Sequence, residues 1–125
     1  ARGYANQRIA FGKPIAQYEL IRSKFANHWA LYEAARLFAY KCAWMIQERR
    51  DCQNECMLAK MLATEMCQSA VDEASRIYGG NSFAMEYAQQ RWFRDARFTL
   101  FGGGCHEVLL NTLGAAYLRR GPSGK

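Results

Sequence analysis

A run of three glycines, Gly102 to Gly104, is the feature of this sequence best suited to bind an anion. The run follows Phe101 and precedes Cys105, His106 and an apolar segment. Glycines at the start of a helix leave backbone amides exposed, and such amides bind phosphate. The same run can instead form an ordinary turn. The sequence leaves both interpretations open, and it raises the question whether a catalytic side chain lies beside the glycines.

Two further segments combine glycine with a basic side chain. Arg8 lies shortly before a Phe-Gly-Lys-Pro segment, and Arg76 lies shortly before the pair Gly79 and Gly80. Glycine permits positive φ and lets a ligand approach bare backbone. Taken alone, Arg8 is typical of a solvated helix charge, and the glycine pair is typical of a helix cap. For the glycine pair, both roles can hold at once.

The cysteines and histidines do not follow a metal-binding pattern. The chain has five cysteines and two histidines, and it has no Cys-x-x-Cys pair. Cys52 and Cys56 are four residues apart, but His28 and His106 lie far from them in the sequence. An odd number of cysteines without secretory features indicates reduced thiols. We therefore expect no metal site, small apolar roles for the cysteines, and a protein of the cytoplasm or the mitochondrial matrix.

Charge and composition argue against several classes of protein. Lysine and arginine total 17 against 11 acidic residues, and the net charge of +6 favours anionic partners. The basic residues are scattered, so nucleic-acid binding is not expected. No apolar run approaches the ~20 residues that a membrane span requires. Because Ala1 lies within a helical pattern, we expect the chain to begin inside a larger protein.

Helices must position these segments, because the apolar pattern is helical nearly throughout the chain. The pattern predicts the end of a helix over 1–11, a break at 12–14, and helices over roughly 14–49, 55–78, 85–97 and 104–119. No strand is expected. The predicted fold class is all-α, an antiparallel up-and-down bundle of the four-helix type, with two long helices at its centre. Residues 120–125 are expected to form a disordered tail.

Three ordered segments resemble the C-terminal helical domain of the acyl-CoA dehydrogenases. They are R-x-x-F-G-x-P-I at Arg8–Ile15, I-Y-G-G-N at Ile77–Asn81 and R-x-x-R-D-A-R at Arg91–Arg97, and the glycine run follows them. The resemblance covers residues 1 to about 119 and implies that the first helix is truncated. Members of this family are flavoproteins that introduce a double bond between the α and β carbons of an acyl thioester. It also implies an N-terminal helical domain and a middle β domain outside this chain.

The resemblance implies contacts with FAD for eight residues: Arg8, Phe11, Glu19, Arg76, Gly79, Gly80, Cys105 and Glu107. Arg8 would reach the pyrophosphate of a neighbouring subunit's FAD, with Phe11 packed beside it. The glycine pair would lie along the ADP half of the same cofactor. Glu19 and Arg76 stand where many members have glutamine, and our hypothesis is that the Arg76 cation offsets the Glu19 carboxylate.

The start of the last predicted helix is implied to contact FAD as well. Cys105 stands where the family usually has threonine, and Glu107 lies two residues further on. We expect His106 to face solvent, as a polar histidine in a first helical turn usually does. For Arg91 and Asp95 we expect a structural ion pair at i, i+4 spacing and no catalytic role.

Gly103 occupies the position where many family members carry the catalytic glutamate, so this chain contains no candidate base. That carboxylate removes the α proton while the β hydride passes to the flavin. Two interpretations stay open. In branches that resemble the isovaleryl, long-chain and crotonobetainyl-type enzymes, the glutamate lies on an upstream helix, which here would precede Ala1. Alternatively, the parent protein has lost the base and is a non-catalytic subunit of a heteromeric dehydrogenase.

The expected function is part of a FAD-dependent acyl-CoA dehydrogenase. Its implied partners are an acyl-CoA thioester, an electron-transfer flavoprotein or similar acceptor, and further copies of itself in a dimer or tetramer. The isolated chain is expected to be inactive, because the middle domain and the base are missing. Nitroalkane oxidase and the acyl-carrier-protein dehydrogenases share the general pattern. An unrelated helical assembly domain is the remaining alternative.

Overall fold

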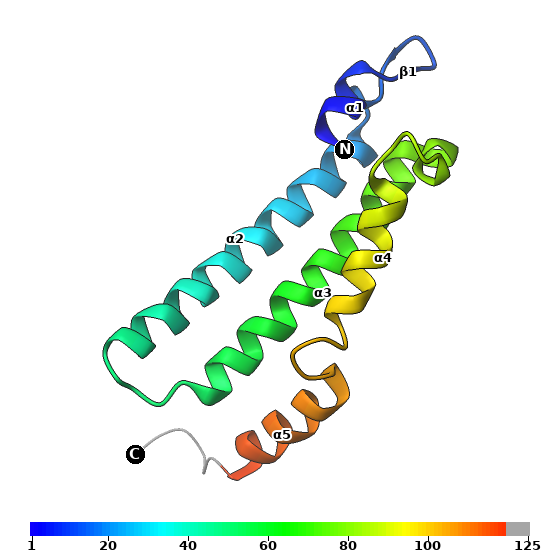
Figure 1. The fold of residues 1–125 in the computed structure, drawn as a ribbon. Coiled ribbons are helices and arrows are strands. Elements are labelled where there is room, and N and C mark those ends of the chain that lie inside the picture. Colours follow the sequence, from blue (N-terminus) through cyan, green and yellow to red (C-terminus); the bar gives the residue numbers. More distant parts are fainter. Residues whose placement is uncertain (120–125) are drawn as a thin grey trace.

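Helices make up most of the chain, as expected (Figure 1). The computed structural model describes residues 1–119, and the predicted tail at 120–125 lies outside them. The α-helices of the described part are α1 (Arg2–Gln7), α2 (Glu19–Gln47), α3 (Gln53–Tyr78), α4 (Gln89–Thr99) and α5 (His106–Arg119). Short 3-10 helices, η1 (Ile15–Gln17) and η2 (Gly79–Phe83), precede α2 and follow α3. The prediction of an all-α helical bundle is confirmed.

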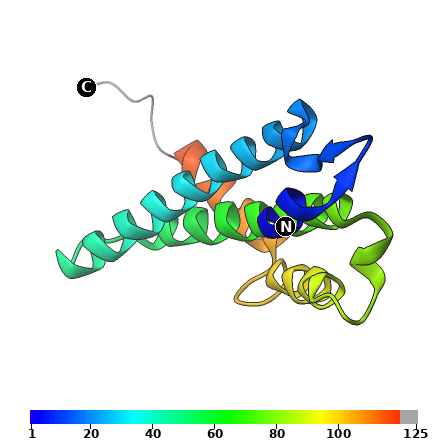
Figure 2. The same cartoon turned by 90° about the horizontal axis from the view of Figure 1, so that it is seen from above.

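Helix α3 is the centre of the arrangement. It lies antiparallel to α2, and the two long helices are joined at one end by a short loop (Figure 1). Helices α4 and α5 both contact α3, and Figure 2 shows α2 and α4 on different sides of it. Because α3 contacts α1, α2, α4 and α5, it provides a common frame for all the segments with predicted chemistry.

A short antiparallel hairpin joins α1 to η1 and corrects the expectation that no strand is present. Strands β1 (Ile9–Ala10) and β2 (Lys13–Pro14) pair with each other. Their two-residue turn consists of Phe11 at φ 50° and Gly12 at φ 82°. Positive φ at both central residues matches the right-handed twist of a hairpin. Strands of two residues are too short to produce an alternating pattern, which explains why the sequence did not reveal them.

Several predicted helix boundaries are wrong by a few residues. Helix α2 begins at Glu19 instead of near residue 14, because Tyr18 has an extended backbone with ψ 135°. Helix α4 begins at Gln89 instead of near residue 85, because η2 and a turn occupy the preceding residues. Helix α5 begins at His106, since Gly103 and Gly104 have positive φ and cannot belong to it.

The core of this domain is made largely of small side chains, and many large apolar side chains lie outside it. The buried residues are Ala5, Ala35, Cys42, Met45, Ile77, Ser82, Gln89, Ala96 and Leu109. By contrast, Trp29 on α2 is 71% exposed and Leu118 on α5 is 84% exposed. Among the helices over residues 1–119, none combines the length and hydropathy that crossing a bilayer requires.

Candidate functional site

Arg8 and the glycine pair, far apart in the sequence, lie together where α1 meets the end of α3 (Figure 1). They line a hollow of about 290 Å³. Its lining residues are Tyr4, Arg8, Ile15, Arg76, Ile77, Tyr78, Gly79, Gly80 and Asn81. Four of the eight predicted FAD contacts are therefore brought to one place: Arg8, Arg76, Gly79 and Gly80.

Three tyrosines hold α1 against this end of α3. The Tyr4 ring stacks on the Tyr78 ring with centroids 4.2 Å apart, and Tyr87 meets Tyr78 edge-on at 5.4 Å. Asn81 Nδ2 donates a 2.9 Å hydrogen bond to the Tyr4 hydroxyl. The backbone N–H of Arg8 donates to the Tyr4 carbonyl at 2.8 Å, so the same helix turn anchors Arg8. The sequence did not indicate that these tyrosines meet, because residues 4, 78 and 87 share no spacing signal.

The hollow fits a phosphate-containing group. Arg8 ends α1 with an extended backbone and is exposed, and none of the ion pairs within residues 1–119 involves it. Gly79 has φ 61° and ψ −140°, a conformation that side chains strongly disfavour, and a Cβ built on Gly79 or Gly80 would meet nothing within 4 Å. A guanidinium with uncommitted donors and bare backbone are together suited to a pyrophosphate.

Phe11 and Glu19 do not line the hollow. Phe11 is at the tip of the turn and is 96% exposed. Glu19 is the exposed first residue of α2. The Tyr18 hydroxyl donates a 2.8 Å hydrogen bond to the Ala10 carbonyl, which fixes the hairpin to the start of α2. Phe11 is thus presented outward by a hairpin that is tethered to the start of α2, where Glu19 lies.

Arg76 forms an ion pair with a residue that the sequence analysis did not consider. Its Nε donates a 2.9 Å hydrogen bond to Asp72, one turn earlier on α3. This bond, together with the negative charges of Asp72 and Glu73, raises the pKa of Arg76 above its usual value. Among the ion pairs of the described chain, Arg76 does not pair with Glu19. The offset of Glu19 by Arg76 therefore stays a hypothesis without a contact in this chain.

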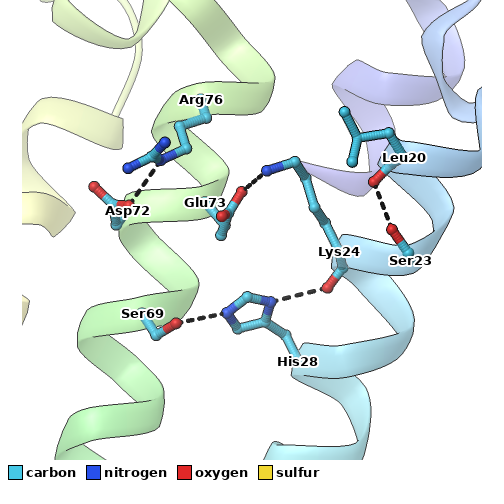
Figure 3. Close-up of polar contacts among 8 residues, drawn as sticks. All are labelled: Leu20, Ser23, Lys24, His28, Ser69, Asp72, Glu73 and Arg76. Atoms are coloured by element: carbon cyan, nitrogen blue, oxygen red, sulfur yellow. Dashed lines mark hydrogen bonds and ion pairs between the residues drawn. The ribbon is translucent and has the colours of Figure 1, made fainter.

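The helix face beside Arg76 joins α3 to α2 through polar contacts (Figure 3). Glu73 points toward Lys24 and forms an ion pair with it, whereas Arg76 turns toward Asp72. One turn along, His28 Nε2 lies 3.0 Å from the Ser69 hydroxyl, and its Nδ1 lies 2.8 Å from the Lys24 carbonyl. His28 is therefore a structural residue between two helices.

The glycine run forms the turn between α4 and α5. Gly103 has φ 70° and Gly104 has φ 103°, in the region that glycine alone adopts without strain. A Cβ at Gly103 would meet nothing within 4 Å, so backbone conformation, and not crowding, makes glycine suitable there. A glutamate at Gly103 would strain this turn. The residue at the usual position of the base is thus part of a turn that requires glycine.

Cys105 and Glu107 lie on either side of the first residue of α5. Cys105 is half-buried, and its carbonyl accepts a 3.1 Å hydrogen bond from the Leu109 N–H. Glu107 is exposed in the first helical turn, where the helix dipole favours a carboxylate. Their contact with FAD is not tested by these observations and stays a prediction.

Two of our expectations for side chains are wrong. His106 does not face solvent: its side chain is 12% exposed, and Nε2 lies 2.6 Å from the Thr64 hydroxyl on α3. The start of α5 packs against the middle of α3, and no sequence pattern indicated this contact. The ion pair expected between Arg91 and Asp95 is not among those formed within residues 1–119, and both side chains are exposed.

The predicted contacts fall into two sets along α3 and not into one site. Arg76 belongs to the hollow, and Thr64 marks the position of the glycine turn. Twelve residues separate them, or about 18 Å at 1.5 Å per residue. In the part of the chain that the structure describes, no cluster of three or more histidine, cysteine or acidic side chains could hold a metal ion.

Comparison with known proteins assigns the family. The family model described as 'Acyl-CoA dehydrogenase, C-terminal domain' matches residues 1–118 of this chain. Benzylmalonyl-CoA dehydrogenase of Aromatoleum aromaticum is 41% identical over 106 residues, which cover 85% of this chain and 28% of the relative. The caffeyl-CoA reductase–Etf complex subunit CarC of Acetobacterium woodii is 35% identical over 101 residues, covering 80% of this chain and 27% of the relative.

A solved structure agrees with both the family and the fold. Butyryl-CoA dehydrogenase of Megasphaera elsdenii superimposes with a TM-score of 0.90 at 36% identity, covering 94% of this chain and 31% of that one. The chain thus spans less than a third of the length of these relatives. With the matching helical bundle and the ordered segments, these similarities show that the chain belongs to the acyl-CoA dehydrogenase family and corresponds to its C-terminal domain.

Proposed function

We propose that the protein containing this domain is a FAD-dependent acyl-CoA dehydrogenase that introduces an α,β double bond into an acyl-CoA thioester. The observation that carries this proposal is the hollow in which Arg8 meets the bare backbone of Gly79 and Gly80. An exposed guanidinium beside open glycine backbone is suited to the pyrophosphate of a dinucleotide. When bound, FAD supplies the acceptor for the substrate's β hydride.

The residues of the hollow would hold the cofactor, and they would do so for a neighbouring subunit. Arg8 would contact the pyrophosphate, and Gly79 and Gly80 would lie along the ADP half. Phe11 would pack beside the same FAD from the tip of its hairpin. The support for this role is that the Phe11 ring is 96% exposed and therefore free to meet a ligand. Glu19 and Arg76 would border the group, with Arg76 held in place by Asp72.

The start of α5 would face a second copy of FAD, belonging to the same subunit. The carboxylate of Glu107 and the amides near Cys105 lie about 18 Å along α3 from the hollow, which supports assignment to a different cofactor copy. This arrangement requires a homo-oligomer, a dimer or a tetramer. Large exposed side chains on α2 and α5, such as Trp29, Tyr117 and Leu118, are consistent with surfaces that other subunits or domains cover.

The catalytic base would lie outside this chain, on the upstream helix. The support is that Gly103, at φ 70°, suits the backbone of the turn, as expected if the base is held elsewhere. The alternative is a non-catalytic subunit of a heteromeric dehydrogenase. A glutamate on an upstream helix of the full-length protein would distinguish the two, because its replacement by glutamine would abolish oxidation in an active enzyme.

An electron-transferring flavoprotein is the proposed electron acceptor. The support is the relative from Acetobacterium woodii, whose name places it in a complex with Etf. Within the domain itself, no catalytic side chain is proposed, so residues 1–125 alone would not oxidise an acyl-CoA.

The test uses the full-length parent protein. Purified protein is expected to carry flavin, seen as visible absorbance, and acyl-CoA thioesters added without oxygen are expected to bleach it. Reoxidation by an electron-transferring flavoprotein would support the proposed acceptor. A protein that binds no FAD when reconstituted, and that oxidises none of a series of short, branched, aromatic and long acyl-CoA thioesters, would contradict the proposal.

A further inference from the structure

Lys60 connects α3 to both ends of the glycine turn. Its Nζ donates a 2.7 Å hydrogen bond to the Gly104 carbonyl and lies 3.5 Å from the Leu100 carbonyl. Leu100 caps the C-terminus of α4. The last carbonyls of a helix lack partners within it and carry partial negative charge, so an ammonium group there is doubly favourable. One half-buried lysine thus contacts the turn at residues 100 and 104.

A second contact holds the turn from a position one helical turn further along α3. Thr64 lies four residues after Lys60 and therefore on the same helix face. The Thr64 hydroxyl lies 2.6 Å from His106 Nε2 and 2.9 Å from the Lys60 carbonyl. A hydroxyl has one hydrogen to donate; if the Lys60 carbonyl receives it, the bond from His106 is donated by Nε2–H. His106 Nδ1 lies 3.4 Å from the exposed carboxylate of Glu65.

The segment between these contacts needs outside support. Gly102, Gly103 and Gly104 have no side chains to pack, and glycine loses more conformational freedom on ordering than any other residue. Lys60 holds the turn before α5, and the Thr64–His106 contact holds the first residue of α5. Together these two contacts to α3, the Lys60 contact and the His106 contact, set the position of the amides that follow the turn.

We propose that Lys60 and His106 are positioning residues of the dehydrogenase. They hold the turn at 100–105 in one conformation, so that the backbone near Cys105 and Glu107 meets the flavin and the thioester in a fixed arrangement. This inference rests on the proposed function. Neither side chain touches the reacting atoms, and each acts through the backbone that it holds.

The experiment compares lysine variants of the full-length holoenzyme. K60M keeps the aliphatic stem and removes the ammonium group. K60R keeps a cation that can reach the same carbonyls. K41M is the matched control, since Lys41 lies on α2 with its ammonium 5.3 Å from the Phe38 ring and makes no contact with the turn. T64V removes the hydroxyl that hydrogen-bonds to His106 at nearly constant volume.

K60M is expected to lower kcat by about 10- to 100-fold, the size of effect that a misplacement of about 1 Å produces. The KM for acyl-CoA is expected to change much less, and the visible flavin spectrum is expected to shift. K60R is expected to recover most of kcat, and K41M to match the wild type. T64V is expected to lower kcat in the same direction by a smaller factor. A purely structural role would lower the melting temperature without this kinetic and spectral signature.

Hydrogen exchange of residues 100–107 gives a readout that does not depend on activity. Both K60M and T64V are expected to exchange faster there than K41M, and this holds even if one of the two variants folds poorly. The positioning role is overturned if an active wild type and K60M have the same kcat, KM and flavin spectrum. It is also overturned if K41M lowers kcat by as much as K60M does. Absence of flavin and of acyl-CoA oxidation in the wild type would contradict the proposed function instead.

Discussion

The hollow at Arg8 and the glycine turn at residues 100–105 both present bare backbone, but different forces hold them. Stacked tyrosines support the hollow, with Tyr4 and Tyr78 centroids 4.2 Å apart. Polar contacts support the turn, through Lys60 at 2.7 Å and His106 at 2.6 Å. The contact energy of the hollow is spread over three aromatic rings, whereas the glycine turn depends on a few polar contacts to α3. The two regions should therefore respond differently to similar substitutions.

The largest expected effect is on the hollow's ligand and comes from Arg8. R8Q in the full-length protein should weaken FAD binding by about 10- to 100-fold, because hydrogen bonds to charged groups contribute roughly 1.5–3 kcal/mol. Titration of the apoprotein with FAD, followed by flavin fluorescence, measures the change. R2Q is the control, since Arg2 is also exposed on α1. Equal losses in both variants would show that overall charge matters and the position of Arg8 does not.

The next largest effect compares the glycines themselves. G79A should lower the free energy of unfolding by about 2–3 kcal/mol, because φ 61° with ψ −140° is nearly closed to side chains. G103A should cost about 1–2 kcal/mol, the usual strain of an alanine at positive φ. Urea unfolding followed by circular dichroism measures both. Gly80 lacks a positive φ, so G80A should change stability by less than about 0.5 kcal/mol.

Removing one hydroxyl from each region tests whether the two are independent. Y4F loses the bond from Asn81, and T64V loses the bond with His106, and each should cost about 1 kcal/mol of stability. Y4F should weaken FAD binding without faster exchange at 100–107, and T64V should do the reverse. Because the regions lie about 18 Å apart along α3, the double variant should show additive losses. A clear departure from additivity would mean that the regions form one coupled unit.

The smallest expected effect concerns the thiols of Cys42 on α2 and of Cys52, which caps the start of α3. Burial, and then the contact with Cys56, raises the pKa of Cys42; the hydrogen bond from Cys56 raises that of Cys52. A raised pKa leaves less thiolate below it, so alkylation of both by iodoacetamide should be slow near neutral pH and accelerate as pH rises beyond about 8.5, the ordinary cysteine value. Peptide mass spectrometry reads each site. Rapid labelling of Cys52 at neutral pH would contradict the assignment.

The raised pKa values of these two thiols also make the free energy of unfolding depend on pH. A thiol whose pKa is raised in the fold keeps its proton longer than in the unfolded chain. Its contribution is therefore fully present below the unfolded pKa and is lost as pH rises through the folded value. Stability should fall slightly in that alkaline range, and the loss should be smaller in C42A.

Much of the fold could be predicted from the periodicity of apolar residues and from the glycines that end helices. The helical pattern predicted the five helices, and Gly79 marked the end of α3, because glycine adopts the φ that stops a helix. The β1–β2 hairpin could not be predicted, since its strands of two residues show no alternation. The late start of α2 was also missed, because the extended backbone at Tyr18 carries no signal in residue type.

Only part of the candidate site could be predicted, namely the segments that combine glycine with arginine. Arg8 and the glycine pair were expected to serve one cofactor, and Arg8 does lie beside Gly79 and Gly80. The expected ion pair of Arg91 and Asp95 failed, because i, i+4 spacing permits a contact on an exposed face but adds too little energy to enforce it.

The sequence by itself determined the helical class, the family and the positions that need glycine, because each of these depends on local residue type and spacing. Only the tertiary structure decided that Tyr4 stacks on Tyr78, that Lys60 reaches the glycine turn and that His106 is covered by α3. These contacts join residues more than 40 positions apart. Their energy depends on which turns of two helices meet, and the apolar spacing along a single helix does not specify that.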